Sequence, residues 1–215
     1  MKSYVQYGAG NQSVPGWLNF DASPTLRIQK IPLLGRLLKN RLNSIFDDEV
    51  QYGDIVKGLP IDGASADYVF CSHILEHLAL DDFHTALNNT FRILKKGGGL
   101  RVIIPDLRMD INDYVRDMAS DDDVVRQKAS IKFCKNSRLG MPGSRVSLIG
   151  RISYLFGNSS HRWMWDSDSL TAALSAHGFI DIKPFKNNDS DDEMLLRPER
   201  PHQFERGIAY QCRKP

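Results

Sequence analysis

The sequence has few cysteines and no long apolar run. Its three cysteines, Cys71, Cys134 and Cys212, are scattered over 215 residues and form no pair at metal-ligand spacing. They argue against a disulfide framework and fit a reducing cytoplasm. No stretch approaches the ~20 apolar residues of a transmembrane helix, and the N-terminus enters a strand-like run without an apolar signal segment. We therefore expect a cytoplasmic protein with no integral membrane segment.

A strong charge of one sign is also missing. The 28 lysines and arginines nearly balance the 26 aspartates and glutamates, giving a formal net charge of +2. Such a balance gives no argument for a nucleic-acid partner, and we expect none. A chain of 215 residues can bury one well-formed core, so we expect a single domain over residues 1–215.

The most regular part of the chain reads as strand, helix, strand. Residues 66–71 form a short apolar run typical of a buried strand, and residues 100–104 form a second one closed by Pro105. Between them we expect a helix that is ended by the glycines 97–99. Its apolar positions lie three to four residues apart, at Phe83, Ala86, Leu87, Phe91 and Leu94. This spacing predicts a βαβ unit in a parallel sheet.

Three further strands are expected before this unit, at residues 4–7, 17–20 and 50–52. Only about ten residues connect the first two, which is short for a crossover helix, so we expect that helix to be reduced to a turn. A dinucleotide-binding fingerprint would require glycine at position 13, where the chain has Ser13, and nicotinamide binding is therefore disfavoured.

Glycines and polar residues follow the ends of these strands. Ligands of open parallel sheets bind outside the carboxyl ends of the strands, so this convergence predicts a functional cleft. The residues concerned are Gly8, Gly10, Asp21, Asp54, Ser72, His73 and Asp106.

An ordered set of short motifs resembles the central half of a class I S-adenosylmethionine-dependent methyltransferase, in particular the small bacterial type-11 group. The resemblance covers roughly residues 4–110 and, more weakly, 161–183. It implies a Rossmann-like, doubly wound, seven-stranded and mostly parallel sheet with a C-terminal antiparallel hairpin, in an αβα sandwich. The motifs are Gly53-Asp54, Leu59-Pro60, Asp67-Tyr68-Val69, Leu75-Glu76-His77, Arg92-Ile93-Leu94-Lys95, Gly97-Gly98-Gly99-Leu100 and Pro105-Asp106.

The resemblance also implies a cofactor, S-adenosyl-L-methionine, and its binding residues. Asp21 would take the ribose hydroxyls, Asp54 and the backbone of Ile55 would meet the adenine, and the remaining binding residues would be Gly8, Gly10, Ser72 and His73. Gln6 departs from the family, which usually has an acidic residue just before the first glycine. Together with the short first connection, Gln6 supports an alternative, a non-catalytic module that keeps the fold for binding.

The segment His73-Ile74-Leu75-Glu76-His77 matches the His-x-x-Glu-His pattern of inverted zinc peptidases. That pattern needs a helix through all five residues, whereas His73 directly follows a strand, so zinc hydrolysis is a minor alternative. Some quinone-type methyltransferases use a similar Leu-Glu-His region for a divalent metal, but we assign no metal ligand here. A buried structural role for His77 is a further alternative.

The segment His161-Arg162-Trp163-Met164-Trp165-Asp166 combines a histidine with two tryptophans. These side chains could line a small-molecule pocket in which His161 is the general base that accepts a proton from an acceptor hydroxyl. His73 and His77 are the other candidates for this base. Alternatively the tryptophans belong to the core and His161 to the surface. A helix capped by Asp166 or Ser167 should follow, and strands at 179–182 and 208–212 should form the terminal antiparallel hairpin.

Two segments have less regular patterns. Residues 22–46 contain five basic residues and no acidic one. The alternatives for them are a helix packed on the sheet, a flap over the cleft, or peripheral contact with a membrane. By the resemblance, residues 110–160 form the region that selects the acceptor. Similar proteins often serve cell-surface polysaccharide pathways, so we expect a sugar or lipid-linked glycan hydroxyl as acceptor, and a monomer or homodimer.

Overall fold

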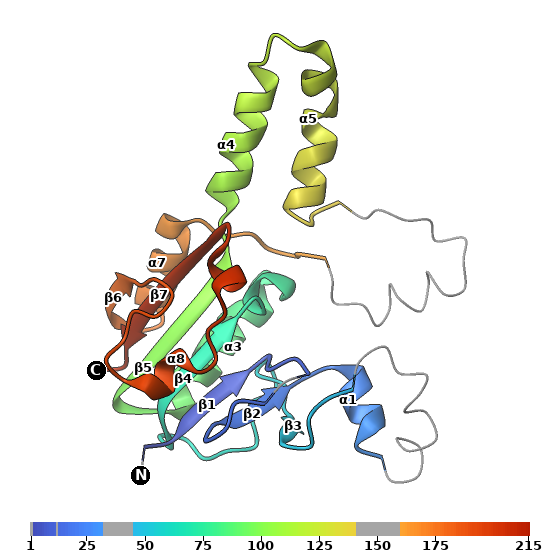
Figure 1. The fold of residues 1–215 in the computed structure, drawn as a ribbon. Coiled ribbons are helices and arrows are strands. Elements are labelled where there is room, and N and C mark those ends of the chain that lie inside the picture. Colours follow the sequence, from blue (N-terminus) through green and yellow to red (C-terminus); the bar gives the residue numbers. More distant parts are fainter. Residues whose placement is uncertain (1, 12, 32–44, 141–159) are drawn as a thin grey trace.

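The computed structural model describes residues 2–11, 13–31, 45–140 and 160–215. Its centre is a seven-stranded sheet with the order β3-β2-β1-β4-β5-β7-β6 (Figure 1). The strands are β1 (Tyr4–Tyr7), β2 (Leu18–Asp21), β3 (Val50–Tyr52), β4 (Ala66–Ser72), β5 (Leu94–Pro105), β6 (Ile180–Pro184) and β7 (Gly207–Arg213).

Strands β1 to β5 pair in parallel, and β7 runs antiparallel to both of its neighbours, β5 and β6. The predicted fold class, a mostly parallel seven-stranded sheet with a C-terminal antiparallel hairpin, is therefore confirmed. Parallel strands end at one edge of the sheet, and all five predicted strand ends meet there.

Helices α3 (Leu80–Ile93) and α7 (Ser167–Ala176) supply apolar side chains to the core on one side of the sheet. Asp166 caps α7 as expected, and Gly178 follows the helix with a φ of 85°. The helix of the βαβ unit was predicted to end at glycines 97–99. This prediction was wrong, because α3 stops at Ile93 and these glycines belong to β5. A Cβ on Gly99 would lie 2.8 Å from the ring of Tyr68, so the glycine allows close approach of the paired strand.

The opposite side of the sheet is covered by a C-terminal segment of the chain and not by a helix between β1 and β2. Between β1 and β2 the described residues form turns and no helix, as the short connection predicted. The chain from Phe185 to Phe204 packs there instead, through α8 (Glu193–Leu196) and the 3₁₀ turn η3 (Pro201–Phe204). Trp17 is buried under it and donates from its indole N–H to the carbonyl of Met194 at 3.1 Å. The C-terminal segment thus replaces the missing helix.

One buried ion pair fastens this C-terminal segment. The guanidinium of Arg101, on β5, pairs with the carboxylate of Glu199 and also donates to the carbonyl of Asp189. The side chains of Arg101 and Glu199 are 4% and 0% exposed, and Arg101 also lies over the ring of Phe185 at 4.3 Å. The second Glu199 oxygen accepts from the backbone of Asn188 at 2.9 Å. No local sequence pattern predicts this pair, because its two residues are far apart in the chain.

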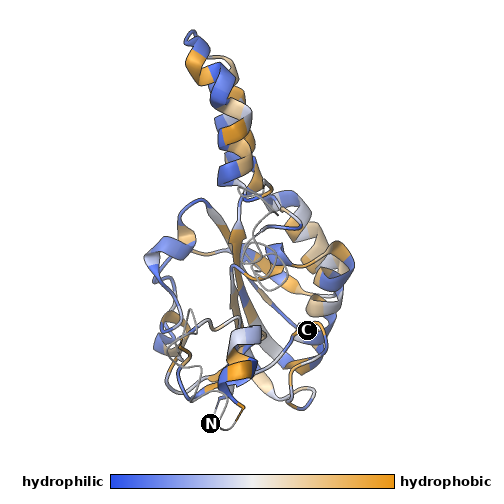
Figure 2. Cartoon of the chain, turned by 90° about the vertical axis from the view of Figure 1, so that its right-hand side faces the viewer, coloured by the Kyte–Doolittle hydropathy of each residue, from blue (hydrophilic) through white to orange (hydrophobic). Residues whose placement is uncertain are grey.

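Helices α4 (Leu107–Met118) and α5 (Asp123–Asn136) form a hairpin that projects from the sheet (Figures 1 and 2). The apolar residues Ile111, Tyr114, Val115 and Met118 are exposed rather than packed on the body of the protein. Arg206 holds the base of the hairpin through Asp110, at 2.6 Å.

The described part of the basic segment packs on the edge of the sheet. Helix α1 (Pro24–Gln29) buries Leu26, and the side-chain amide of Gln29 exchanges two hydrogen bonds with the backbone of Phe46. Residues 32–44 of this segment, and 141–159 of the expected acceptor region, lie outside the described residues. In the part of the chain that the structure describes, no helix is long and apolar enough to cross a membrane.

Candidate active site

The first loop of the site is built on two glycines after β1. Gly8 and Gly10 have φ values of 72° and 63°, a left-handed conformation that disfavours side chains. A Cβ on Gly8 would overlap the side chain of Ile74, whereas a Cβ on Gly10 would meet no atom within 4 Å. The backbone at Gly10 therefore faces open space, as required where a ligand approaches closely.

Asp21 closes this loop from the end of β2. One carboxylate oxygen accepts from the backbone N–H of Gly10 at 2.9 Å, and the other accepts from Ser23 at 2.8 Å. Asp21 is 9% exposed, and burial raises its pKa against the opposing effect of these two hydrogen bonds. A carboxylate has about four acceptor positions, so Asp21 can hold the glycine loop and still accept from ribose hydroxyls.

A cavity of about 290 Å³ lies beside the glycine loop. Its walls include Gly8, Ala9 and Ser72 on one side and Arg200 and Gln203 of the C-terminal segment on the other. The hydroxyl of Ser72 is buried and has no hydrogen-bond partner among the described residues, and an orphaned group of this kind indicates a ligand. An unpartnered hydroxyl and a nearby guanidinium suit the amino and carboxylate groups of the cofactor, so these residues fit S-adenosylmethionine.

The predicted adenine-binding residues lie after β3. The carboxylate of Asp54 accepts from the backbone N–H of Val56 at 3.0 Å and lies 3.4 Å from the ammonium of Lys57. Ile55 is buried, and its carbonyl accepts from the side chain of Asn89 at 2.8 Å. Asp54 therefore caps the turn that follows β3, and an adenine contact for Asp54 and Ile55 stays a prediction.

Asp106 follows the end of β5 and has a structural task. Its carboxylate accepts from the backbone N–H of Arg108 at 2.9 Å and so caps α4. Its backbone forms an isolated bridge with Trp165. Asp106 therefore joins the sheet edge to the segment that contains His161.

Four side chains meet at the end of β4. His73 has a φ of 54°, a left-handed conformation that is uncommon outside glycine and typical of functional sites. It leads into the 3₁₀ turn η2 (Leu75–His77), in which Glu76 is buried. One Glu76 carboxylate oxygen lies 3.4 Å from Nδ1 of His73, 3.8 Å from Nε2 of His77 and 4.0 Å from Nε2 of His161. We call these four residues the Glu76 cluster.

Backbone hydrogen bonds bring His161 into this cluster. The N–H groups of Arg162 and Trp163 both donate to the carbonyl of Glu76, at 2.8 and 3.2 Å, and the N–H of His161 donates to Arg138 at 3.1 Å. His161 is buried, so the alternative that placed it on the surface was wrong. The two motifs are 85 residues apart in sequence, and only the fold places them together.

The pKa values of two cluster histidines shift in opposite directions. Burial alone lowers the pKa of His73, but its interactions with Glu76 and Gln203 outweigh burial and raise it. Burial lowers the pKa of His161, and the Glu76 charge offsets this only in part. At neutral pH His161 is therefore the neutral imidazole, the form that accepts a proton.

The two tryptophans of this segment have different positions. Trp165 is buried and stacks on Phe83 of α3 with ring centroids 4.2 Å apart, as in the core alternative. Trp163 is 42% exposed, and its backbone is bonded to Glu76. Trp163 thus leaves an aromatic surface near the Glu76 cluster.

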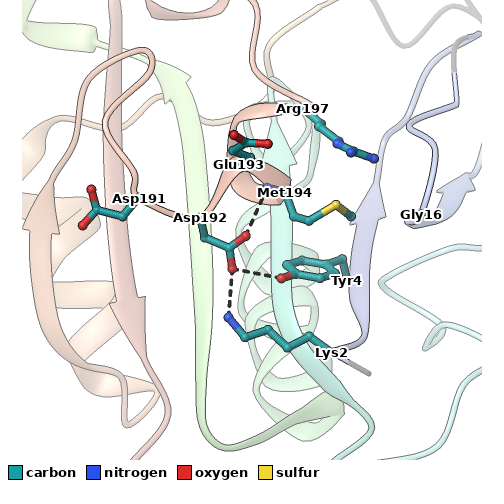
Figure 3. A pocket seen from close by; sticks show the side chains of 8 residues that line it. All are labelled: Lys2, Tyr4, Gly16, Asp191, Asp192, Glu193, Met194 and Arg197. Atoms are coloured by element: carbon teal, nitrogen blue, oxygen red, sulfur yellow. Dashed lines mark hydrogen bonds and ion pairs between the residues drawn. The ribbon is translucent and has the colours of Figure 1, made fainter.

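A larger hollow of about 740 Å³ lies at the other end of β1, away from the glycine loop (Figure 3). Three of its polar side chains, those of Lys2, Tyr4 and Asp192, are already paired with one another. Asp192 accepts from the ammonium of Lys2 and from the hydroxyl of Tyr4, both at 2.9 Å, and it caps α8 through Met194. We assign no ligand to this hollow.

Residues 20–102 match the family model described as a methyltransferase domain. These residues run from the end of β2 to β5 and contain Asp21, Asp54, Ser72 and most of the Glu76 cluster. The match covers this segment of the chain, which is therefore similar to methyltransferase domains, and the strand order agrees with the fold expected from the sequence. S-adenosyl-L-methionine is the cofactor of this family.

Similar solved structures include three methyltransferases. A S-adenosylmethionine-dependent methyltransferase of Thermotoga maritima is 16% identical with a TM-score of 0.47, over 100% of this chain and 83% of that one. One of Archaeoglobus fulgidus is 15% identical with a TM-score of 0.47, over 99% and 86%. Phosphoethanolamine N-methyltransferase 2 of Haemonchus contortus, in complex with S-adenosylmethionine, is 14% identical with a TM-score of 0.47, over 100% and 50%. No curated protein matches the sequence.

Proposed function

We propose that the enzyme methylates a hydroxyl group of a small-molecule acceptor, a sugar or a lipid-linked glycan intermediate, in polysaccharide biosynthesis in the cytoplasm. The observation that carries this proposal is the Glu76 cluster, in which three imidazoles surround a buried carboxylate. The cluster lies at the carboxyl ends of the parallel strands, the edge at which such sheets bind their ligands. The choice of a sugar follows the association of similar proteins with polysaccharide pathways.

A hydroxyl acceptor explains why a proton-accepting group is present. The cofactor supplies an activated methyl group on its sulfonium, so positioning provides most of the acceleration. The acceptor oxygen forms a bond to the methyl carbon while the carbon–sulfur bond breaks, and the hydroxyl proton has to leave. In the proposed reaction Nε2 of His161 takes this proton, and the Glu76 carboxylate, 4.0 Å away, stabilises the imidazolium. His77 is the reserve base.

His73 is less suited to accept the proton than the sequence analysis expected. Its Nε2 lies 2.8 Å from the carbonyl of Gln203, an acceptor, so this nitrogen carries a proton. Its Nδ1 faces Glu76, and its raised pKa favours the charged form. We therefore propose that His73 orients the Glu76 carboxylate and shapes the cofactor end of the site.

The exposed indole of Trp163 supports a ring-shaped acceptor. It provides a flat apolar surface beside the cluster, and small-molecule sites commonly combine such surfaces with a few polar groups. An acceptor that packs on Trp163 could place a hydroxyl towards the imidazole of His161. The replacement Trp163→Ala should then raise the acceptor KM more than it lowers kcat.

The cofactor part of the proposal is tested by calorimetric titration with S-adenosylmethionine and S-adenosylhomocysteine. We expect micromolar binding that weakens tenfold or more in Asp21→Ala, because the ribose loses its acceptor and the Gly10 loop its anchor. Asp62→Ala changes an aspartate in the turn before β4, at the opposite edge of the sheet, and serves as the control that should bind both ligands normally. If the wild-type protein binds neither ligand, the non-catalytic module becomes the better description.

The acceptor is tested with methyl-labelled cofactor and a panel of nucleotide sugars, polyprenyl-linked saccharides, amines and thiols. A labelled methyl ether on a saccharide is the expected product, and its formation should fall at least a hundredfold in His161→Gln. Transfer to amines or thiols alone, with no saccharide labelled, would refute the hydroxyl acceptor. Turnover with any acceptor would exclude the non-catalytic alternative.

A further inference from the structure

We propose that Glu76, His77 and His161 bind a divalent transition-metal ion of the zinc class. One ligand atom from each residue lies within 4.8 Å of the other two. The sequence alone assigns no metal ligand, because the His-x-x-Glu-His pattern needs a helix over residues 73–77, and residues 73–77 indeed do not form an α-helix. The fold replaces His73 by His161 from a distant segment.

The spacing of the three ligand atoms suits a shared ion better than direct hydrogen bonds. Glu76 lies 3.8 Å from Nε2 of His77 and 4.0 Å from Nε2 of His161, beyond the 2.7–3.2 Å of an N–H···O hydrogen bond. Ligands about 2.0–2.2 Å from a tetrahedral zinc ion lie roughly 3.3–3.6 Å apart. Coordination of one ion would therefore require the three side chains to rotate inward.

The Glu76 carboxylate has one close polar neighbour, Nδ1 of His73 at 3.4 Å. Its side chain is 1% exposed, and neither oxygen has a hydrogen-bond partner among the described residues. A buried carboxylate without a hydrogen bond is costly, and native structures rarely retain one without a ligand or a cation. A divalent ion would compensate the charge and coordinate at least one of the two oxygens.

The orientation of His77 gives an independent argument. Its Nδ1 lies 3.1 Å from the carbonyl of Ser160, which can only accept, so Nδ1 carries the proton. This leaves Nε2, which lies 3.8 Å from the Glu76 carboxylate, as the nitrogen that can bind a cation held between the two side chains. Metal-binding histidines are held in this way, with the second nitrogen donating to a backbone carbonyl.

The donor set defines the class of ion. Two imidazoles and one carboxylate, with a position left for water or substrate, are the ligands of catalytic zinc sites, and the same set also accepts ferrous iron. Hard ions such as magnesium prefer oxygen ligands and are disfavoured here. With the ion bound, the ion itself would lower the pKa of the acceptor hydroxyl, whereas in the metal-free enzyme Nε2 of His161 is the base described above.

The experiment uses the full chain, purified without a polyhistidine tag and stripped with a chelator. Titration with Zn²⁺ should show one site per chain with a submicromolar Kd, and Co²⁺ should give the visible absorption bands of a four-coordinate ion. Glu76→Gln and His161→Gln should each weaken Zn²⁺ binding at least a hundredfold. His84→Gln, which alters a histidine outside the cluster, is the matched control and should bind normally.

Thermal unfolding with and without Zn²⁺ is a second test, and it shows whether each variant is folded. Zn²⁺ should raise the Tm of the wild type and of His84→Gln, and it should leave the Tm of Glu76→Gln unchanged. The proposal is overturned if the folded wild type binds neither Zn²⁺, Co²⁺ nor Fe²⁺ at stoichiometric level, or if Glu76→Gln and His161→Gln bind as the wild type does. Titration with S-adenosylhomocysteine on the same samples reports on the proposed function separately, since it needs no metal.

Discussion

Replacing Glu199 by alanine should destabilise the protein and weaken cofactor binding together. The carboxylate pairs with Arg101 in the interior, where both side chains are almost fully excluded from solvent. Glu199→Ala leaves the Arg101 guanidinium buried without its counter-charge. It also removes the acceptor for the backbone N–H of Asn188. The C-terminal segment, which forms one wall of the 290 Å³ cavity, would lose its main attachment to β5.

The magnitude follows from the burial of the pair. Breaking a buried ion pair by removing one partner costs about 3–5 kcal/mol, because the remaining charge stays desolvated. For a chain of this size a loss of 1 kcal/mol lowers Tm by about 2–4 °C, so the expected decrease is roughly 6–20 °C. The double variant Arg101→Met with Glu199→Leu should recover most of this loss, since apolar residues of similar volume often replace a buried pair at little cost.

Thermal unfolding followed by circular dichroism measures the decrease in Tm, and titration with S-adenosylhomocysteine measures the affinity. Glu205→Ala, an exposed glutamate six residues along the chain, is the matched control and should change Tm by less than about 2 °C. If Glu199→Ala and Glu205→Ala melt alike, the ion pair does not fasten the segment. If Glu199→Ala melts low but binds the ligand normally, the segment does not contribute to the cofactor cavity.

Two further predictions concern the glycine loop and a histidine pair. Gly8→Ala should abolish cofactor binding in titration, because its Cβ would overlap a neighbouring isoleucine, whereas Gly10→Ala meets only the cost of a left-handed backbone, about 1–2 kcal/mol, and should remain folded. Nδ1 of His84 lies 2.9 Å from Nε2 of His177, whose pKa is lowered first by burial and then by the charge of His84. The folded state then binds a proton less readily than the unfolded state, so stability should fall as pH drops from the unfolded pKa near 6.5 through the lower folded pKa. Urea unfolding at several pH values should show this loss in the wild type and a smaller one in His84→Ala, and equal slopes in both would contradict it.

The strands were predictable because their signals are local. Buried parallel strands appear as short apolar runs, and Ala66–Ser72 and Leu94–Pro105 contain such runs. The turn between β1 and β2 was also predictable, since the length of a connection limits what it can contain. The glycines 97–99 were misassigned because glycine marks both helix ends and close strand approach, and the facing ring of Tyr68 is not visible in the sequence.

The candidate site was predictable only in part. The sequence by itself placed Gly8, Asp21 and His73 at strand ends, because the order of strands in a parallel sheet brings their carboxyl ends to one edge. It could not join Glu76 to His161 or Arg101 to Glu199. Each of these pairs spans more than eighty residues, and no local pattern encodes a contact made by two distant segments. Only the tertiary structure decided that a buried carboxylate meets three imidazoles, because that meeting depends on how the chain after α5 packs against the end of β4.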